Sequence, residues 1–276
     1  MTSAIPQSLA GRVAVITGAG KGLGRAYALD FARRGAAVVV NNRRRNQDEP
    51  SSAEAVTQEI IAAGGAAVAN LDSVEAEESG ERLLALALER FGRLDILVNN
   101  AGVPEAKTLH KQTAREFRAL FDINFFGPLN VTLPIYRHML DRGYGRIVVS
   151  TSSAGLHGNH GMASYAASKA ALIGLARTIA TEGIARGVRC NALSPYGATA
   201  MTEAYLDDAM KRRMHPDFVA PVAAWLASEG CTANGEIFVA GADRVRRSAS
   251  VEARGIGAAA LTPELLAAHD GALRHR

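Results

Sequence analysis

The chain has 276 residues, a formal net charge of +4 and 48% hydrophobic residues, a composition typical of a globular protein. This charge requires neither a nucleic acid nor a membrane surface as partner, and the two isolated cysteines, Cys190 and Cys231, give no disulfide framework or zinc-binding spacing. No apolar run reaches the roughly 18 residues of a membrane span, and the first residues lack a signal-peptide core, so we expect a cytoplasmic protein without a metal.

Short β-branched runs alternate with longer alanine-rich helical patterns along most of the chain. We expect strands at 12–17, 36–41, 66–71, 94–100, 146–152, 188–194 and 236–241, and helices at 22–34, 52–63, 74–91, 113–141 and 164–185. Apolar strands that alternate with helices are typical of a parallel sheet covered on both faces. The sequence therefore predicts a doubly wound α/β fold of the Rossmann type, with a seven-stranded, mostly parallel sheet and helices on both faces.

This pattern is consistent with one domain over residues 1–242, followed by a C-terminal extension over 243–276. The extension is rich in arginine and alanine, and only "TPELLAAH" suggests a short helix. We interpret its arginines as a solvated tail, with binding to the phosphates of an acyl-CoA as the alternative.

A glycine-rich segment, "TGAGKGLG", runs from Thr17 to Gly24, between the first strand and the first helix. Glycine at 18, 22 and 24 lets the backbone turn tightly and approach a pyrophosphate, and the helix that follows offers free N–H groups to the phosphates. A purely structural turn is the alternative. The cofactor interpretation places the phosphate site at Gly18, Lys21, Gly22, Leu23 and Gly24.

A second pattern lies in "ASYAASKAAL", where Tyr165 and Lys169 are four residues apart in a run of small side chains. On a helix they lie one turn apart on the same face. Taken alone, this spacing is more typical of a surface pair, with an aromatic packed on a neighbour and a lysine in solvent. Its meaning depends on the other motifs in the chain.

Together, "TGAGKGLG", "NNAG" at 99–102, Ser152, and Tyr165 with Lys169 resemble the motifs of the short-chain dehydrogenase/reductase family. The resemblance covers about residues 10–242. Segments such as "VANLDSVE" and "CNALSP" are similar to the (3R)-hydroxyacyl-CoA dehydrogenase branch, which occurs as a portion of peroxisomal D-bifunctional proteins.

The resemblance implies a catalytic role for four residues. Tyr165 is the expected general acid/base, and the Lys169 ammonium is expected to favour its phenolate and to bind the nicotinamide ribose. Ser152 would hydrogen-bond the reacting oxygen, and its spacing to Tyr165 favours it over Thr151 and Ser153. Asn124 would hold a water that relays protons from Lys169.

The resemblance also implies a nicotinamide dinucleotide. At the end of the second strand, Asn42 stands where an acidic residue would bind the ribose hydroxyls of NAD, and Arg43 can pair with a 2′-phosphate. NADP(H) is therefore favoured over NAD(H), with NAD beside a solvated arginine turn as the alternative. The further contacts implied are Asp72, Ser73, Asn99, Ala101, Gly102, Pro195 and Thr202.

The predicted activity is hydride transfer between this cofactor and a small-molecule secondary alcohol or ketone, with a 3-hydroxyacyl thioester as the first substrate. The alternatives are a steroid, sugar or quinone carbonyl, or a regulatory protein that binds NAD(P) without turnover. We expect Leu156, His157, Asn159 and Met162 to line the substrate pocket. The helices at 113–141 and 164–185 are expected to form the interface of a homodimer or homotetramer.

Overall fold

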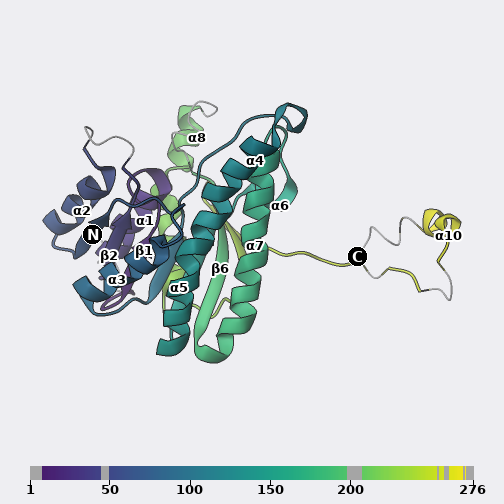
Figure 1. Cartoon of the computed structure of the whole chain (residues 1–276). Coiled ribbons are helices and arrows are strands. Elements are labelled where there is room, and N and C mark those ends of the chain that lie inside the picture. Colours follow the sequence, from purple (N-terminus) through teal and green to yellow (C-terminus); the bar gives the residue numbers. More distant parts are fainter. Residues whose placement is uncertain are drawn as a thin grey trace.

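The computed structural model of the chain describes residues 8–44, 50–197, 207–253, 255–257, 261–269 and 271. Its centre is an eight-stranded sheet in the order β3-β2-β1-β4-β5-β6-β7-β8 (Figure 1). Strands β1 to β7 pair in parallel, and β8 pairs antiparallel to β7. The strands are β1 (Val13–Ile16), β2 (Ala37–Asn41), β3 (Ala67–Asn70), β4 (Ile96–Asn99), β5 (Gly145–Ser150), β6 (Val188–Pro195), β7 (Ile237–Gly241) and β8 (Arg244–Ser248).

Helices cover both faces of this sheet, as the alternation of strands and helices predicts. The described helices are α1 (Gly22–Arg33), α2 (Ser52–Ala62), α3 (Ser79–Phe91), α4 (Ala114–Phe121), α5 (Gly127–Arg142), α6 (Ser153–His157), α7 (Ala163–Gly183), α8 (Asp208–Arg213), α9 (Ala220–Ala227) and α10 (Pro263–Ala268). Helices α1, α2 and α9 share one core with Ala14 and Ile16, whereas α3, α5 and α7 share the other with Val13 and Val15. Successive residues of β1 thus point to opposite cores, because side chains alternate along a strand.

The predicted fold class is confirmed, and the structure also contains elements that the sequence did not predict, among them helix α9 and strand β8. The sheet has an eighth strand, β8, so it continues past residue 242. The helices expected over 113–141 are α4 and α5, and a π-helical segment, Asp122–Phe126, lies between them. Helix α3 begins at Ser79 rather than at residue 74.

The order of the strands determines where a ligand can bind. From β1 the chain winds in one direction to β2 and β3, and then returns to place β4 on the other side of β1. In open parallel sheets, ligands bind at the carboxyl ends of the strands beside such a switch point. Because these strands are parallel, the loops that follow β1, β2, β4, β5 and β6 all begin at this edge. Among the described residues, no helix combines the length and apolar character that crossing a membrane requires.

Candidate active site

The turn between β1 and α1 leaves no room for a side chain at Gly18 or Gly24. Gly18 and Gly22 have φ angles of 64° and 53°, which L residues with a Cβ rarely adopt. A Cβ at Gly18 would lie 2.9 Å from the Ala101 Cα, and one at Gly24 would collide with the Gly18 carbonyl oxygen. Lys21 is the N-cap residue of α1, and its side chain makes no capping hydrogen bond to the helix. The first N–H groups of α1 therefore face a backbone cradle that suits a phosphate.

Two residues that the sequence interpretation did not single out hold this turn against β4. The Thr17 hydroxyl accepts hydrogen bonds from the Asn100 and Ala101 N–H groups at 3.0 and 3.1 Å. The Asn100 side chain donates to the Thr17 and Gly18 carbonyls at 3.2 and 3.3 Å. Both residues lie inside the quoted motifs, but only the pairing of β1 with β4 shows that the motifs meet.

Asn99 occupies a different place from its neighbour Asn100. Its side chain is buried and donates to the Thr132 hydroxyl of α5 at 2.7 Å, so it ties the sheet to a helix. Gly102, by contrast, lies at the centre of the predicted site. A Cβ at Gly102 would lie 3.1 Å from Asn124 Oδ1 and 3.3 Å from Lys169 Nζ. Glycine at 102 thus allows the "NNAG" segment to pass close to two of the predicted catalytic residues.

The ends of β2 and β3 bring together the residues predicted to contact the adenosine. Asn42 donates to the Ser52 hydroxyl at 2.8 Å, at the start of α2. Arg43 forms an ion pair with Glu75 at 2.7 Å, and the Ser73 hydroxyl donates to the same carboxylate oxygen at 2.8 Å. Asp72 accepts from the Asn70 side chain at 3.0 Å.

The structure distinguishes the adjacent hydroxyls of Thr151 and Ser152, which follow β5. The Thr151 hydroxyl is buried and donates to the Lys169 carbonyl at 2.8 Å, so it fixes the backbone of α7. Ser152 has an extended backbone and caps α6, accepting from the Ala154 N–H at 3.2 Å. The Ser152 side chain also interacts with the Tyr165 hydroxyl and acts to lower the pKa of that phenol. Of Thr151 and Ser152, only Ser152 therefore faces the predicted acid/base.

Burial governs the titration of Tyr165. It raises the pKa of the phenol above its usual value, and the interaction with Ser152 offsets part of this rise. The sequence interpretation expected the Lys169 ammonium to lower this pKa. Lys169 Nζ lies 5.8 Å from the centre of the Tyr165 ring, one helix turn along α7. The pKa of Tyr165 is nevertheless raised, and burial is the main cause.

Lys169 is buried in the same site. Its Nζ donates to the Ser150 carbonyl at 2.9 Å, at the end of β5. Burial lowers the pKa of Lys169 to about 8, because the charged ammonium is poorly solvated there. The amine is thus held at a fixed place between β5, Gly102 and Tyr165.

Asn124 lies in the π-helical segment between α4 and α5 and is fully buried. Its side chain accepts from the Val103 N–H and donates to the Val103 carbonyl, both at 2.9 Å. Single-turn π segments of this kind are frequent at functional sites. The segment turns Asn124 toward the loop that follows "NNAG", beside Gly102.

The remaining predicted contacts lie after β6. Pro195 ends this strand, and a Cβ at Gly197 would lie 3.1 Å from the Leu23 side chain of the glycine-rich turn. The loop after β6 therefore closes over α1. Thr202 lies outside the described residues.

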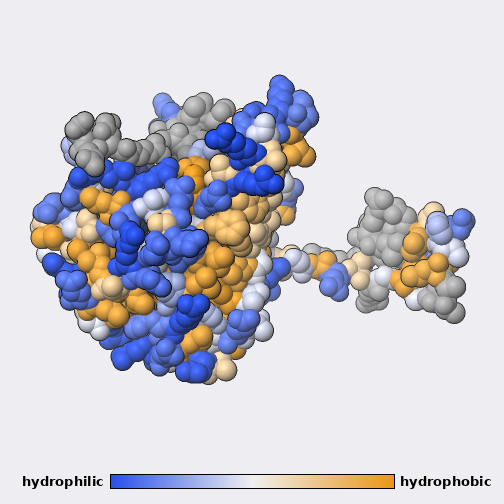
Figure 2. All heavy atoms as spheres, in the orientation of Figure 1, coloured by the Kyte–Doolittle hydropathy of each residue, from blue (hydrophilic) through white to orange (hydrophobic). Residues whose placement is uncertain are grey.

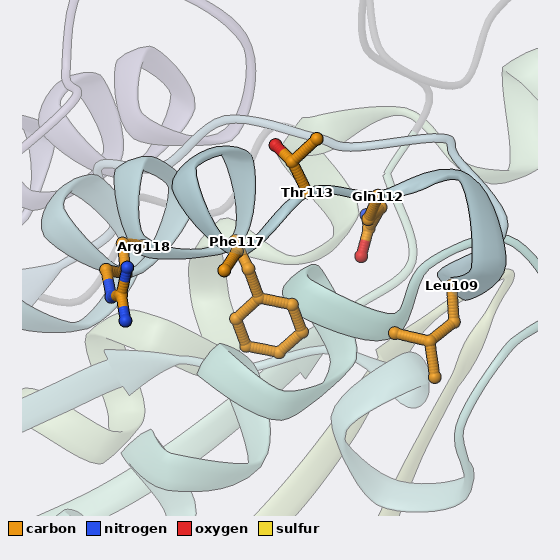
Figure 3. Close-up of a pocket in the computed structure, with 6 residues that line it drawn as sticks. Leu109, Gln112, Thr113, Phe117 and Arg118 are labelled. Carbon is orange, nitrogen blue, oxygen red and sulfur yellow. The ribbon is translucent and has the colours of Figure 1, made fainter.

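A cavity of about 350 Å³ lies on the side of α4, lined by Leu109, Gln112, Thr113, Ala114, Phe117 and Arg118 (Figure 3). Gln112 connects it to the site, because its side chain donates to the Ser164 hydroxyl, one residue before Tyr165, at 3.0 Å. The cavity is not lined by the predicted pocket residues Leu156, His157, Asn159 and Met162. Within the part of the chain that the structure describes, no group of three or more His, Cys, Asp or Glu side chains could hold a metal ion.

Comparison with known proteins agrees with this geometry. The family model for short chain dehydrogenases matches residues 12–210. The chain is 40% identical over 242 residues to a short-chain type dehydrogenase/reductase of Mycobacterium tuberculosis, an alignment that covers 86% of this chain and 85% of that protein. It is 41% identical over 243 residues to mouse peroxisomal multifunctional enzyme type 2, which covers 87% of this chain but only 33% of the mouse enzyme. A 3-oxoacyl-[acyl-carrier-protein] reductase of Synechocystis is 37% identical over 199 residues, 71% of this chain and 78% of the reductase.

Solved structures show the same relationship. A short chain dehydrogenase from Mycobacterium avium superposes with a TM-score of 0.85 at 32% identity, over 96% of this chain and 95% of that one. An NAD(P)-dependent gluconate 5-dehydrogenase from Beutenbergia cavernae with bound NADP superposes with a TM-score of 0.76 at 34% identity, over 85% of this chain and 97% of that one. With the glycine-rich turn, "NNAG", Ser152, Tyr165 and Lys169 meeting at one edge of the sheet, the chain belongs to the short-chain dehydrogenase family.

Proposed function

We propose that the protein moves a hydride between a nicotinamide dinucleotide and a secondary alcohol or ketone held at Ser152 and Tyr165. The observation that carries this proposal is the contact between the Ser152 and Tyr165 side chains, with buried Lys169 one turn away. The side-chain-free cradle formed by Gly18 and Gly24 fits the cofactor's pyrophosphate. When bound, the nicotinamide ring supplies or accepts the hydride.

The protonation states of the site suit its role in reduction. Burial raises the pKa of Tyr165, so at neutral pH its hydroxyl carries the proton that a ketone oxygen needs as it becomes an alcohol. Ser152 donates a hydrogen bond to the same oxygen while negative charge develops on it. Lys169, with a pKa of about 8, is mostly protonated at neutral pH. Its positive charge stabilises the phenolate that Tyr165 becomes when it gives up its proton. In the oxidation direction Tyr165 takes the proton of the alcohol instead.

For the substrate, we propose a 3-hydroxyacyl or 3-ketoacyl thioester. The names of the relatives support this class, since the Synechocystis relative is a 3-oxoacyl-[acyl-carrier-protein] reductase and an acetoacetyl-CoA reductase of Allochromatium vinosum is 36% identical over 166 residues. A regulatory protein without turnover would need the glycine-rich turn but not the set of Ser152, Tyr165 and Lys169. Steroid, sugar and quinone carbonyls remain the competing substrates.

For the cofactor, we propose NADP(H) over NAD(H). Strand β2 ends in Asn41 and continues with Asn42, so neither residue places a negative charge beside a 2′-phosphate. Arg43 follows at the same edge, and a relative of known structure was solved with NADP. Replacing Arg43 by alanine should weaken NADPH binding by about ten- to a hundredfold, because a charge-assisted hydrogen bond contributes about 1.5–3 kcal/mol.

For the assembly, we propose a homodimer or homotetramer, located in the cytoplasm. Large apolar side chains lie exposed in and beside α5 and α7, namely Phe126, Leu133 and Ile184. Figure 2 shows apolar surface where these helices face the viewer. Since several relatives are named peroxisomal, cell fractionation is the test of the location.

The proposed reaction is tested by following nicotinamide absorbance with a panel of 3-ketoacyl-CoA thioesters and steroid, sugar and quinone carbonyls. Ser152→Ala should lower kcat by about 10²- to 10³-fold, as removal of an oxyanion donor does. Ser153→Ala is the matched control, expected to stay within about threefold of the wild type. Turnover of no carbonyl in the panel, or equal rates for the two variants, would contradict the proposal.

A further inference from the structure

Arg43, the residue proposed to bind the 2′-phosphate, already has an anionic partner in the structure. Its Nη1 lies 2.7 Å from Glu75 Oε2, and the two side chains are 38% and 34% exposed. The neighbouring Arg44 forms a separate pair with Glu54 at 2.8 Å. The cation that should favour NADP(H) is therefore held by a carboxylate at the same edge of the sheet.

Glu75 is held in this position by two further contacts. The Ser73 hydroxyl donates to Glu75 Oε2 at 2.8 Å, the same oxygen that Arg43 contacts. The Glu75 carbonyl accepts from the Asn130 side chain of α5 at 3.3 Å, which anchors the backbone of the loop after β3. The carboxylate is thus placed by contacts of its own loop and of α5, and does not depend on Arg43 alone.

A 2′-phosphate at Arg43 would meet this carboxylate in two ways. It would compete for the guanidinium, whose N–H groups make the strongest bonds with one bidentate anion at a time. It would also be repelled by the like charge of Glu75. The 2′-hydroxyl of NAD(H) carries no charge, so it neither competes nor is repelled.

We propose that Glu75 is a specificity-determining residue that limits the preference for NADP(H) by pairing with Arg43. This inference rests on the proposed cofactor, and it adds a residue from the loop after β3 to a selectivity that the sequence places only at the end of β2. The balance between the two cofactors is then determined by the Arg43–Glu75 pair rather than by Arg43 alone.

The test measures the Kd of NADPH and of NADH, by quenching of protein or nicotinamide fluorescence, for Glu75→Gln, Arg43→Ala and the double variant. Glu75→Gln keeps the size of the side chain and removes its charge. It should tighten NADPH binding by about three- to tenfold, since exposed ion pairs and nearby like charges have effects of this order, and leave NADH within about twofold. In the Arg43→Ala background the gain should be smaller, because no guanidinium is released.

The matched control is Glu54→Gln, which removes the carboxylate of the adjacent Arg44 pair. It should leave both dissociation constants within about twofold, and thermal unfolding should show that all variants remain folded. If Arg43→Ala weakens NADPH binding but Glu75→Gln does not change it, the inference is wrong and the cofactor proposal stands. If Arg43→Ala leaves the NADPH to NADH ratio unchanged, the cofactor proposal itself fails, and the inference with it. If Glu75→Gln tightens NADPH binding equally in the wild type and in the Arg43→Ala variant, or if it weakens NADH binding, Glu75 does not act through Arg43.

Discussion

At the scale of single residues, burial determines the chemistry of the proposed site more than the distance between charges does. Lys169 is buried between β5 and Tyr165, and its ammonium donates to the Ser150 carbonyl. A carbonyl partner does not replace the water that an ammonium loses. Burial therefore lowers the pKa of Lys169 from 10.5 to about 8.

Because the pKa of Lys169 is lower in the folded chain, we expect the free energy of unfolding to depend on pH through this residue. Between pH 8 and about 10 the unfolded chain keeps a proton on Lys169 that the folded chain releases, so the contribution of this group to stability rises with pH. From pH 8 to 9.5 the wild type should gain about 1–2 kcal/mol in unfolding free energy relative to Lys169→Met, since one pKa unit corresponds to about 1.4 kcal/mol. Urea denaturation of both proteins at the two pH values measures this difference. Parallel pH dependences would show that the lysine titrates normally in the folded state.

Sequence alone predicted the residues whose spacing is fixed by one element. Tyr165 and Lys169 lie one turn apart because both belong to α7. The sequence could not show which of two adjacent asparagines faces the site. Asn99 donates to Thr132 of α5, whereas Asn100 holds the glycine-rich turn, because successive side chains of an extended segment point to opposite sides. Nor could the sequence show that Glu75, in another loop, pairs with Arg43, since this contact depends on how β2 and β3 are arranged.

At the scale of elements, the turn from β1 to α1 combines two demands on Gly24. Gly24 lies in the first turn of α1, where a Cβ would collide with the Gly18 carbonyl, and beside the Asn100 side chain that anchors the glycine-rich turn. The close packing of strand and helix therefore depends on the absence of a side chain at this position.

Gly24→Ala should accordingly destabilise the protein by about 1–3 kcal/mol, the usual cost of overpacking, and should weaken cofactor binding. Gly174→Ala is the control within a helix, because a Cβ at Gly174 meets no atom within 4 Å. It should leave stability unchanged or raise it by up to about 1 kcal/mol, as alanine favours the helix. Chemical denaturation of the two variants checks this, and equal effects would mean that the turn can move to accept a side chain.

Helix α9 and strand β8 were not predicted from the sequence, because neither shows the apolar pattern of its element. Helix α9, "APVAAWLA", is buried on most of its surface, so it shows no amphipathic period, and Pro221 in its first turn reads as a breaker although this position tolerates proline. Strand β8 carries three arginines and is exposed, because an edge strand needs only the backbone of β7 to form. The strands and helices with clear apolar patterns were predicted to within a few residues, apart from the start of α3.

At the scale of the whole molecule, two features lie outside the core that forms the site. One is the apolar surface near α5 and α7. The other is the segment after β8, whose described part Figure 1 shows extending away from the sheet and carrying α10, a helix with no buried residues. The boundary between domain and extension stays a prediction, although β8 joins the sheet beyond residue 242.

We expect Leu133→Glu, on the exposed side of α5, to shift the proposed oligomer toward monomers. Leu133 is 43% exposed in the single chain, and a charge placed in an apolar interface would be left without water or a partner. Ile61→Glu, at a 47% exposed position of α2, is the control and should not change the assembly. Light scattering at micromolar concentration reports the mass of each protein. A wild type that is already monomeric would refute the proposed assembly.

The claim that unites these scales is that Tyr165 moves the proton in a nicotinamide-dependent reaction. The most direct test compares Tyr165→Phe with Tyr136→Phe, which removes a hydroxyl of α5 that has no hydrogen-bond partner among the residues that the structure describes. Cofactor Kd is measured together with kcat on the best thioester or carbonyl of the panel. We predict that Tyr165→Phe lowers kcat by at least about 10²-fold while cofactor Kd stays within about threefold, and that Tyr136→Phe changes neither. Wild-type turnover by Tyr165→Phe would contradict the account.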